Sequence, residues 1–357
     1  MNSRRSFLAG GECALGAPFI SRGRFCLFGA APEVKYSART LDLVRGSTVI
    51  DMLGLLSLNY RKVLAWQANP TAFGAADFQE LKDSGTTVFH QSFGFVSGDV
   101  HAASLRDVSG WNAFIRAHGD KFLRVDGPAD VGRAKAEGKI GIVIGQQNSE
   151  HFRTLADVDR FYALGQRVSQ LTYNHNRLGG GSTDPQSVGL SAYGAEVVAR
   201  MNTLGMAVDV SHCADRTTLD AIEASRKPVL VTHSNCRALA QSARCKTDEA
   251  ICKLAAKGGV MGVTLIRSFV RTAGSVSIED VLDHIDHVAA IAGVEHVGLG
   301  TDFDLHGRNP SSDLDGMQYA RKIYDVTEGL VRRNYSIPDI ELILGRNFQR
   351  ALQQIWV

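Results

Sequence analysis

The amino-acid sequence predicts an α/β protein, a TIM-like (β/α)8 barrel, and three observations support this fold class. Eight short runs of apolar, largely β-branched residues are spaced along the chain, each too short for a helix. The segments between them repeat apolar residues with the period of a helix, as in 192–204 and 219–224. A chain of 357 residues is long enough for one such barrel, and no linker of biased composition divides it.

The predicted barrel strands are continuous apolar runs, typical of parallel strands buried on both faces. We expect them at residues 48–53, 86–90, 140–145, 169–174, 206–211, 228–232, 259–264 and 296–301. A shorter run at 122–125 predicts a ninth, accessory strand. The alternative is an open doubly wound sheet, but no Gly-x-Gly-x-x-Gly motif follows the first run.

Composition excludes two classes of protein. The chain has 39 Lys and Arg against 37 Asp and Glu, a net charge of +2, and no basic run, which argues against nucleic-acid binding through bulk charge. No uninterrupted apolar stretch reaches about 18 residues, the length that a membrane-spanning helix needs. The sequence therefore excludes a polytopic membrane protein.

The N-terminus has the layout of an export signal. Arg4 and Arg5 precede a weakly apolar stretch at 7–20, and small residues follow at 29–31. The stretch Ser-Arg-Arg-Ser-Phe-Leu resembles the twin-arginine signal of bacteria. We therefore expect a signal segment over 1–31, a periplasmic protein, and a single barrel domain over 45–357.

Four cysteines follow the predicted signal segment, and none lies in a Cys-x-x-Cys pair, so a zinc ribbon is not predicted. Free thiols are the favoured interpretation. A disulfide between Cys245 and Cys252 stays open, since the periplasm permits disulfides.

Chemically versatile side chains follow four predicted strands. His175, His212 and His233 stand at the ends of the fourth, fifth and sixth, and Asp302 stands at the end of the eighth. Active sites of these barrels lie at the carboxyl ends of the strands, so we expect the four side chains to meet at one rim. Imidazole and carboxylate groups are ligands of Zn²⁺, which lowers the pKa of bound water to about 7. The sequence therefore predicts a metal site with an aspartate that transfers a proton.

Several segments resemble the membrane (renal-type) dipeptidases, which belong to the amidohydrolase superfamily. They include Gln-Leu-Thr-Tyr-Asn-His at 170–175, Val-Asp-Val-Ser-His at 208–212, Pro-Val-Leu-Val-Thr-His-Ser-Asn at 228–235 and Val-Gly-Leu-Gly-Thr-Asp-Phe-Asp at 297–304. The resemblance extends over about 45–350 and is densest over 165–305. It implies an amidohydrolase-type barrel that hydrolyses dipeptides at a two-zinc site.

The resemblance also implies individual roles. By position, His212 and His233 match the ligands of the second metal. His175 matches the histidine that contacts the substrate and the tetrahedral intermediate, and Arg244 matches the arginine that binds the substrate carboxylate. Asp302 matches the acid–base aspartate. The related enzymes are often dimers, which suggests a homodimer.

The first-metal site departs from the family pattern. The family's Asp-Gly-His-x-Asp motif is replaced here by Asp-Met-Leu-Gly-Leu, which puts Leu53 and Leu55 at two ligand positions. Gln147 stands where the family has its bridging glutamate. Leucine cannot ligate a metal and a neutral amide bridges cations poorly, so we expect these three positions to bind no ion.

Other polar residues could rebuild the missing site. His90 follows the second strand, and Glu150 and His151 follow the third strand's altered motif. We interpret all three as core or loop residues. His284 and His287 are neighbours on a predicted helix face and are expected to be structural.

Three functions stay open. The first is a hydrolase with one zinc ion on His212 and His233, with Asp302 as a further ligand, acting on a dipeptide or another small carboxylate-bearing amide. The second is a metal-poor acid–base enzyme, an epimerase or lyase, using the same side chains. The third is a non-catalytic protein that binds a small molecule on the same barrel.

Overall fold

The computed structural model describes residues 36–306 and 313–356, so the predicted signal segment lies outside the described residues. The strands are β1 (Ile50–Asp51), β2 (Val88–Phe93), β3 (Phe122–Arg124), β4 (Ile140–Gln146), β5 (Gln166–Gln170), β6 (Ala207–Asp209), β7 (Leu230–Ser234), β8 (Val260–Val263) and β9 (Val297–Leu299). All of their pairings are parallel.

Eight of these strands close into a barrel in the order β1, β2, β4, β5, β6, β7, β8, β9 and back to β1. The accessory strand β3 stays outside the closed ring because it pairs only with the first half of β4, with Phe122 opposite Ile140. The second half of the same edge of β4 pairs with β5, where Gly145 lies opposite Val168. The predicted (β/α)8 barrel with a ninth strand is confirmed.

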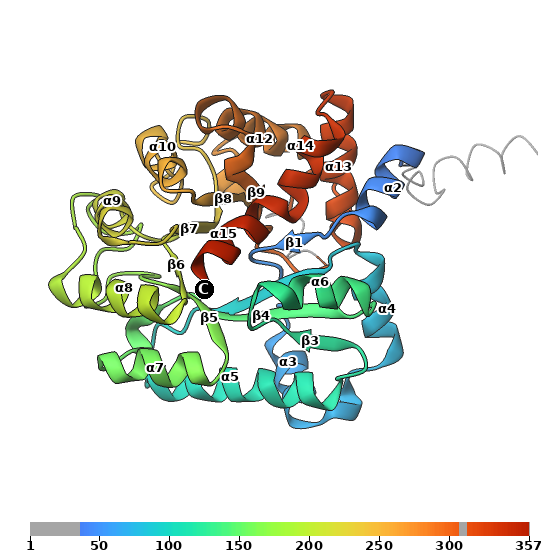
Figure 1. Cartoon of the computed structure of the whole chain (residues 1–357). Helices are drawn as coiled ribbons and strands as arrows, with labels where there is room; N and C mark the ends of the chain where they lie inside the picture. The colour runs from blue at the N-terminus through green and yellow to red at the C-terminus, as the bar shows by residue number, and fades with distance from the viewer. Residues whose placement is uncertain (1–35, 307–312, 357) are drawn as a thin grey trace, which may run out of the picture. The chain divides into compact units, whose positions relative to one another are not determined.

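Helices surround the strands (Figure 1). They are α2 (Ala38–Gly46), α3 (Tyr60–Ala68), α4 (Ala75–Asp83), α5 (Val100–Ala117), α6 (Pro128–Ala136), α7 (Leu155–Ala163), α8 (Ala192–Leu204), α9 (Asp215–Ala224), α10 (Asp248–Ala256), α11 (Arg267–Val270), α12 (Ile278–Ala292), α13 (Lys322–Arg332), α14 (Ile337–Glu341) and α15 (Asn347–Ile355). None of the helices in residues 36–306 and 313–356 is both long and apolar enough to cross a membrane.

Helix α15 closes the amino end of the barrel and lies across its centre in Figure 1. Its apolar residues Phe348, Leu352 and Ile355 form one buried cluster with strand residues such as Ile50 and Val260. The cluster removes apolar side chains from water, and each large side chain so buried stabilises the fold by roughly 1.5–3 kcal/mol. At the opposite end of the barrel, loops follow the carboxyl ends of the strands.

One compact unit extends over Ala38–Val357, so it begins before the predicted domain boundary at residue 45. The additional residues belong to α2, which packs against α13. Leu43 and Val44 of α2 are buried in the main hydrophobic core. Helix α2 is therefore part of the barrel unit rather than a leader.

The strand predicted at 169–174 is displaced toward the N-terminus, to Gln166–Gln170. The chain leaves the ladder early because the Gln170 side-chain amide donates hydrogen bonds to the carbonyl oxygens of Gln147 and Thr172. The Asn176 side chain then folds back on the carbonyl oxygen of Leu171. His175 consequently lies in a long loop before α8 rather than at a strand end, which corrects that expectation.

Candidate active site

The carboxylate of Asp209, the last residue of β6, joins the ends of two neighbouring strands. Its Oδ1 atom accepts hydrogen bonds from the backbone N–H groups of Ser211 and Thr232, each at 3.0 Å. The Ser211 hydroxyl donates to the same oxygen at 2.5 Å and accepts the N–H of His233 at 3.0 Å. This network positions His212 and His233, the residues that follow Ser211 and Thr232.

The two imidazoles face each other across the rim. The Nε2 atoms of His212 and His233 lie 3.1 Å apart, and the rings are tilted by 57°. Two nitrogen ligands at 2.0–2.1 Å from a tetrahedral zinc ion lie about 3.3 Å apart. The donor set and its spacing therefore fit two ligands of one metal ion. We call these two residues the imidazole pair.

A hydroxyl relay determines which nitrogen of His233 faces its partner. The Thr232 hydroxyl donates to Oδ2 of Asp209 at 2.8 Å, which uses its single hydrogen atom. The Thr232 oxygen therefore accepts from Nδ1–H of His233, also at 2.8 Å. The proton on Nδ1 leaves Nε2 with a free lone pair, which is the form that binds metal.

Burial and a nearby positive charge both lower the pKa of the two imidazoles. Burial lowers the pKa of His212 and His233 well below the ordinary value for histidine, and the nearby Arg244 guanidinium lowers each pKa further. Both imidazoles are therefore neutral near pH 7. Tyr173 stacks on His212, with ring centroids 4.2 Å apart and planes inclined by 23°, and so fixes the orientation of that ring.

Arg244 is hydrogen-bonded to the backbone beside the imidazole pair and is 6% exposed. Its guanidinium donates to the carbonyl oxygens of Ser211 and His233, the latter at 2.9 Å. Its Nε–H group is buried and without a hydrogen-bond partner in the described structure, and the guanidinium faces the ring of Phe269. A guanidinium has five N–H donors, so Arg244 keeps capacity for an anionic group.

Asp302 follows β9 and lies near Arg244. Burial lowers the pKa of the Arg244 guanidinium, and the negative charge of Asp302 opposes part of that shift. Its backbone has a φ of 61°, in the left-handed region that few residues other than glycine adopt. Its N–H donates to the carbonyl oxygen of Leu53 at 2.8 Å. Such strained residues concentrate at functional sites.

Asp302 does not complete a three-ligand set with the imidazole pair. In residues 36–306 and 313–356, no three His, Cys, Asp or Glu side chains are grouped so that they could hold a metal ion. His175 is also separate, because its side chain is 66% exposed and contacts Asp184, with 3.3 Å between Nδ1 and Oδ2. Of the four predicted side chains, the structure brings the two imidazoles together.

The first-metal positions contain no ligand side chains. Leu53 and Leu55 are buried in the main hydrophobic core, and the Gln147 amide donates to the carbonyl oxygen of Ser92 at 2.9 Å. Asp51, which begins the altered motif, accepts two hydrogen bonds from Thr301 and lies 3.4 Å from the buried ammonium of Lys322. The residues at these positions do not fit a second metal ion.

His90 lies inside the barrel, in the middle of β2 rather than at its end. Its Nδ1–H donates to the carbonyl oxygen of Met52 at 2.6 Å, and its buried Nε2 has no partner in the described structure. A Cβ atom on Gly145 would lie 2.0 Å from that Nε2. The glycine therefore makes the room that the His90 ring occupies.

Two further candidate histidines contact backbone carbonyl groups. His151 is buried and contacts the carbonyl oxygen of Asn148, while the neighbouring Glu150 is exposed. His284 accepts the N–H of Cys236 and donates to Val270. All four described cysteines are free thiols; Cys252 is exposed and the other three are buried, so Cys245 and Cys252 form no disulfide.

Sequence reasoning did not assign roles to the residues that support the imidazole pair. Thr232 and Asp209 orient His233, and Tyr173 orients His212. Lys246 is also buried, and its ammonium donates to the carbonyl oxygen of Cys213 at 2.9 Å. Burial lowers the pKa of Lys246 to about 8. In the sequence, the feature that points to supporting residues is the polar side chains that precede each histidine, in Asp-Val-Ser-His and Thr-His.

Comparison with known proteins shows to which family the chain is related. The family model described as membrane dipeptidase (peptidase family M19) matches residues 38–356. An uncharacterized dipeptidase of Schizosaccharomyces pombe is 37% identical over 225 residues, which is 60% of this chain and 53% of that protein. Dipeptidase verJ of Clonostachys rogersoniana is 30% identical over 257 residues, 71% of this chain and 65% of the relative. The matches thus span between half and two thirds of these relatives.

Solved structures agree on the fold. An amidohydrolase from Pseudomonas aeruginosa is 27% identical with a TM-score of 0.78, covering 89% of this chain and 99% of that one. A metallo peptidase from Rhodobacter sphaeroides, liganded with a phosphinate mimic of the dipeptide L-Ala-D-Ala, has a TM-score of 0.72 at 20% identity, covering 87% and 99%. With the family model matching almost the whole barrel unit, the chain belongs to the membrane dipeptidase family, peptidase family M19.

Proposed function

We propose that the protein is a dipeptidase-like hydrolase of small, carboxylate-bearing amides that uses one zinc ion. The observation that carries the proposal is the 3.1 Å separation of the Nε2 atoms of His212 and His233. The tautomer that the Thr232 relay imposes on His233 supports it, since the free lone pair faces the partner ring. Leu53, Leu55 and Gln147 argue against a second ion.

Zinc held by the imidazole pair would act as a Lewis acid on the substrate carbonyl and lower the pKa of a bound water molecule to about 7. The chain's own residues supply the rest. Arg244 binds the substrate carboxylate with its remaining N–H donors. Asp302 holds the proton taken from water and returns it to the leaving amine. The family resemblance assigns His175, on the loop before α8, to the substrate and its developing oxyanion.

The substrate class follows from these groups and from the relatives. A buried guanidinium that keeps unused donors suits a carboxylate, which dipeptides carry at one end. The Rhodobacter sphaeroides enzyme was liganded with a dipeptide mimic, which makes L-Ala-D-Ala a reasonable first substrate for this chain.

A second candidate function rests on the missing third ligand. Next to Arg244, two imidazoles with no carboxylate grouped beside them among the described residues would also suit an acid–base enzyme acting on a small carboxylate, or a protein that only binds one. Neither alternative needs zinc. Chelation would then leave function unchanged, whereas it abolishes hydrolysis under the main proposal.

The test is hydrolysis of a dipeptide panel that includes L-Ala-D-Ala, with and without added zinc, followed as released amine. We expect zinc-dependent turnover and, for Arg244→Lys, a raised KM, because a point charge replaces a planar fork. Arg271→Lys is the matched control, since Arg271 is exposed and pairs with Asp280 on α12. Absence of turnover for every dipeptide with zinc present would overturn the proposal.

We also propose export to the periplasm through the segment at 1–31 and assembly into a homodimer. Support comes from the twin arginines, Arg4 and Arg5, and from the family resemblance. Replacing both arginines with lysine is expected to leave the protein in the cytoplasmic fraction of a bacterial host. Sedimentation of the purified protein tests the dimer, and a monomer mass at micromolar concentration would contradict it.

A further inference from the structure

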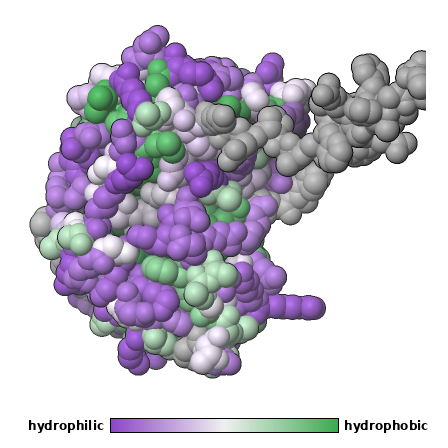
Figure 2. All heavy atoms as spheres, turned by 90° about the vertical axis from the view of Figure 1, so that its right-hand side faces the viewer, coloured by the Kyte–Doolittle hydropathy of each residue, from purple (hydrophilic) through white to green (hydrophobic). Residues whose placement is uncertain are grey.

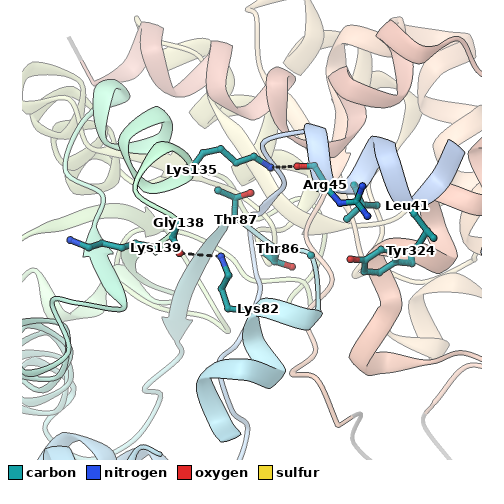
Figure 3. A pocket seen from close by; sticks show the side chains of 11 residues that line it. Leu41, Arg45, Lys82, Thr86, Thr87, Lys135, Gly138, Lys139 and Tyr324 are labelled. Carbon is teal, nitrogen blue, oxygen red and sulfur yellow. Dashed lines mark hydrogen bonds between the residues drawn. The ribbon is translucent and has the colours of Figure 1, made fainter. Parts of the chain in front are cut away.

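A small pocket lies at the amino end of the barrel, remote from the imidazole pair. It has a volume of about 270 Å³ and is lined by the residues that precede β2 and β4, with walls from α2, α4 and α6. Because parallel strands run in one direction, this pocket and the candidate active site are at opposite ends of the strands. We call it the amino-end pocket (Figure 3).

Two lysines of this pocket are held by backbone carbonyl groups. The Lys82 ammonium donates to the carbonyl oxygen of Gly138 at 3.0 Å. The Lys135 ammonium donates to those of Arg45 at 2.7 Å and Ser47 at 2.5 Å. Figure 3 shows the two side chains on opposite sides of Thr86 and Thr87. Both ammonium groups are therefore fixed at the wall of the pocket.

These two charges differ from the other cations that line the pocket. Arg45 pairs with Asp42, and Lys139 pairs with Glu137. Neither Lys82 nor Lys135 forms an ion pair with a carboxylate in the part of the chain that the structure describes. An ammonium has three donors, so Lys82 keeps two and Lys135 keeps one for a further acceptor.

No aspartate or glutamate is among the described residues that line the pocket. Burial lowers the pKa of Lys135, and the charge of Lys82 lowers it further, so the two cations repel each other. The hydroxyls of Thr86 and Ser47 are buried without a hydrogen-bond partner in the described structure. Unpaired buried polar groups are uncommon in native proteins and call for an explanation. An anion bound in the pocket would pair with the two cations and would accept a hydrogen bond from the Thr86 hydroxyl.

We propose that the amino-end pocket binds a phosphate group, held by Lys82 and Lys135 with the Thr86 hydroxyl as a further donor. Phosphate suits this arrangement because it offers several strong acceptor oxygens to donors that come from different directions. The volume is below the about 300–1,000 Å³ of sites for drug-sized ligands, so a small ligand or a single headgroup fits.

The phosphate group could belong to a free ion or to a lipid headgroup. Figure 2 shows a face that carries α2, α4 and α13, which is mostly hydrophilic with small, separate hydrophobic areas. That character suits contact through charge rather than apolar insertion, whether the phosphate is free or at a membrane surface. The chemistry of the site is the same in both cases.

The experiment uses the purified full chain with two probes. Equilibrium dialysis measures binding of labelled inorganic phosphate, and flotation measures binding to phosphatidylglycerol vesicles, with phosphatidylcholine vesicles as the neutral control. Lys82→Gln removes one cation and leaves in place the hydrogen bonds of Lys135 to the end of α2. Lys253→Gln is the matched control, since Lys253 is exposed and pairs with Glu249 on α10. Circular dichroism verifies that each variant is folded.

We expect saturable binding of one probe by the wild type and by Lys253→Gln, and about tenfold weaker binding by Lys82→Gln. Binding of inorganic phosphate identifies a free-anion site, and binding to phosphatidylglycerol vesicles alone identifies a headgroup site. Lys135→Gln should weaken binding to a similar degree if it folds. No saturable binding of either probe, or equal binding by Lys82→Gln and wild type, would overturn the proposal. Dipeptide turnover should be the same in all these variants.

Discussion

The side-chain hydroxyl of Thr232 lies 2.8 Å from Nδ1 of His233 and sets the protonation pattern of that ring. Asp209 accepts the only hydrogen of the hydroxyl, so Thr232 must accept the imidazole proton in turn. Nε2, the nitrogen that faces His212, is thereby left unprotonated, with a free lone pair. The buried carboxylate of Asp209, at the end of β6, thus prepares His233 as a ligand.

Replacing this hydroxyl should weaken metal binding. In Thr232→Val the ring loses its Nδ1 acceptor, so the tautomer is no longer imposed. Outer-shell changes of this kind typically reduce metal affinity by about 10- to 100-fold. Competition with a fluorescent zinc chelator measures the affinity directly.

Thr232→Ser is the matched variant, because it keeps the hydroxyl and removes only a methyl group. It should bind zinc nearly as tightly as the wild type. If Thr232→Val also binds zinc as the wild type does while remaining folded, the relay does not control the tautomer.

A methyl group at Gly145 should destabilise the barrel. The added Cβ atom would lie 2.0 Å from Nε2 of His90, so the ring or the strand must move. Overpacking of this kind costs roughly 1–3 kcal/mol, which urea denaturation resolves. The double variant with His90→Ala should lose less stability than the sum of the two single changes. Simple additivity would show that the glycine and the ring do not compete for space.

Asp107 should make the protein less stable as the pH rises. This carboxyl group is buried between α5 and the barrel, where it accepts a hydrogen bond from Gln146 at 2.8 Å. Burial raises the pKa of Asp107 to about 6, against about 3.9 in an unfolded chain. The folded state therefore binds the proton more tightly, and its stabilising effect is lost as the pH rises from about 4 to 6.

Asp107→Asn removes this titration and keeps an oxygen that can accept from Gln146. We expect the variant to gain stability over wild type, on the order of 3 kcal/mol at pH 7.5, and much less at pH 4. Denaturation at both pH values measures the difference. Asp120→Asn, on an exposed aspartate, is the control and should change neither value. An equal effect of Asp107→Asn at both pH values would contradict the assignment.

The first-metal positions can be tested by restoring the family's residues. The triple variant Leu53→His, Leu55→Asp and Gln147→Glu should bind more metal than wild type if the barrel accepts it. Burying polar groups in place of two core leucines costs several kcal/mol, so zinc should raise the melting temperature of the variant sharply. A folded variant that binds no additional zinc would show that restoring these three residues is not enough to rebuild the first-metal site.

The sequence was sufficient to predict the barrel because its strands are continuous apolar runs of the right length. The strand at 166–170 lies earlier than the sequence pattern predicts because Leu171, Thr172 and Tyr173, which follow it, continue the apolar or β-branched run. Gln170 and Asn176 end the ladder through side-chain hydrogen bonds to the carbonyl oxygens of Gln147 and Leu171. Contacts of that kind depend on the tertiary structure and leave no periodic signal.

The candidate site was predictable in part. His212 and His233 follow directly after short strands, so their meeting followed from the topology. The loop position of His175 and the left-handed backbone of Asp302 could not be read from the residues alone. The role of Thr232 follows from the position of its hydroxyl between Asp209 and His233, which the sequence alone does not give.

The most direct test of the main proposal is the zinc content of the purified protein, measured by plasma mass spectrometry after dialysis against buffered zinc. One metal bound by the imidazole pair predicts about one zinc ion per chain, lost in His233→Ala. It should be retained in His287→Ala, whose histidine contacts Asp248 at the surface. A wild-type chain with no zinc, or zinc retained in His233→Ala, would contradict the account.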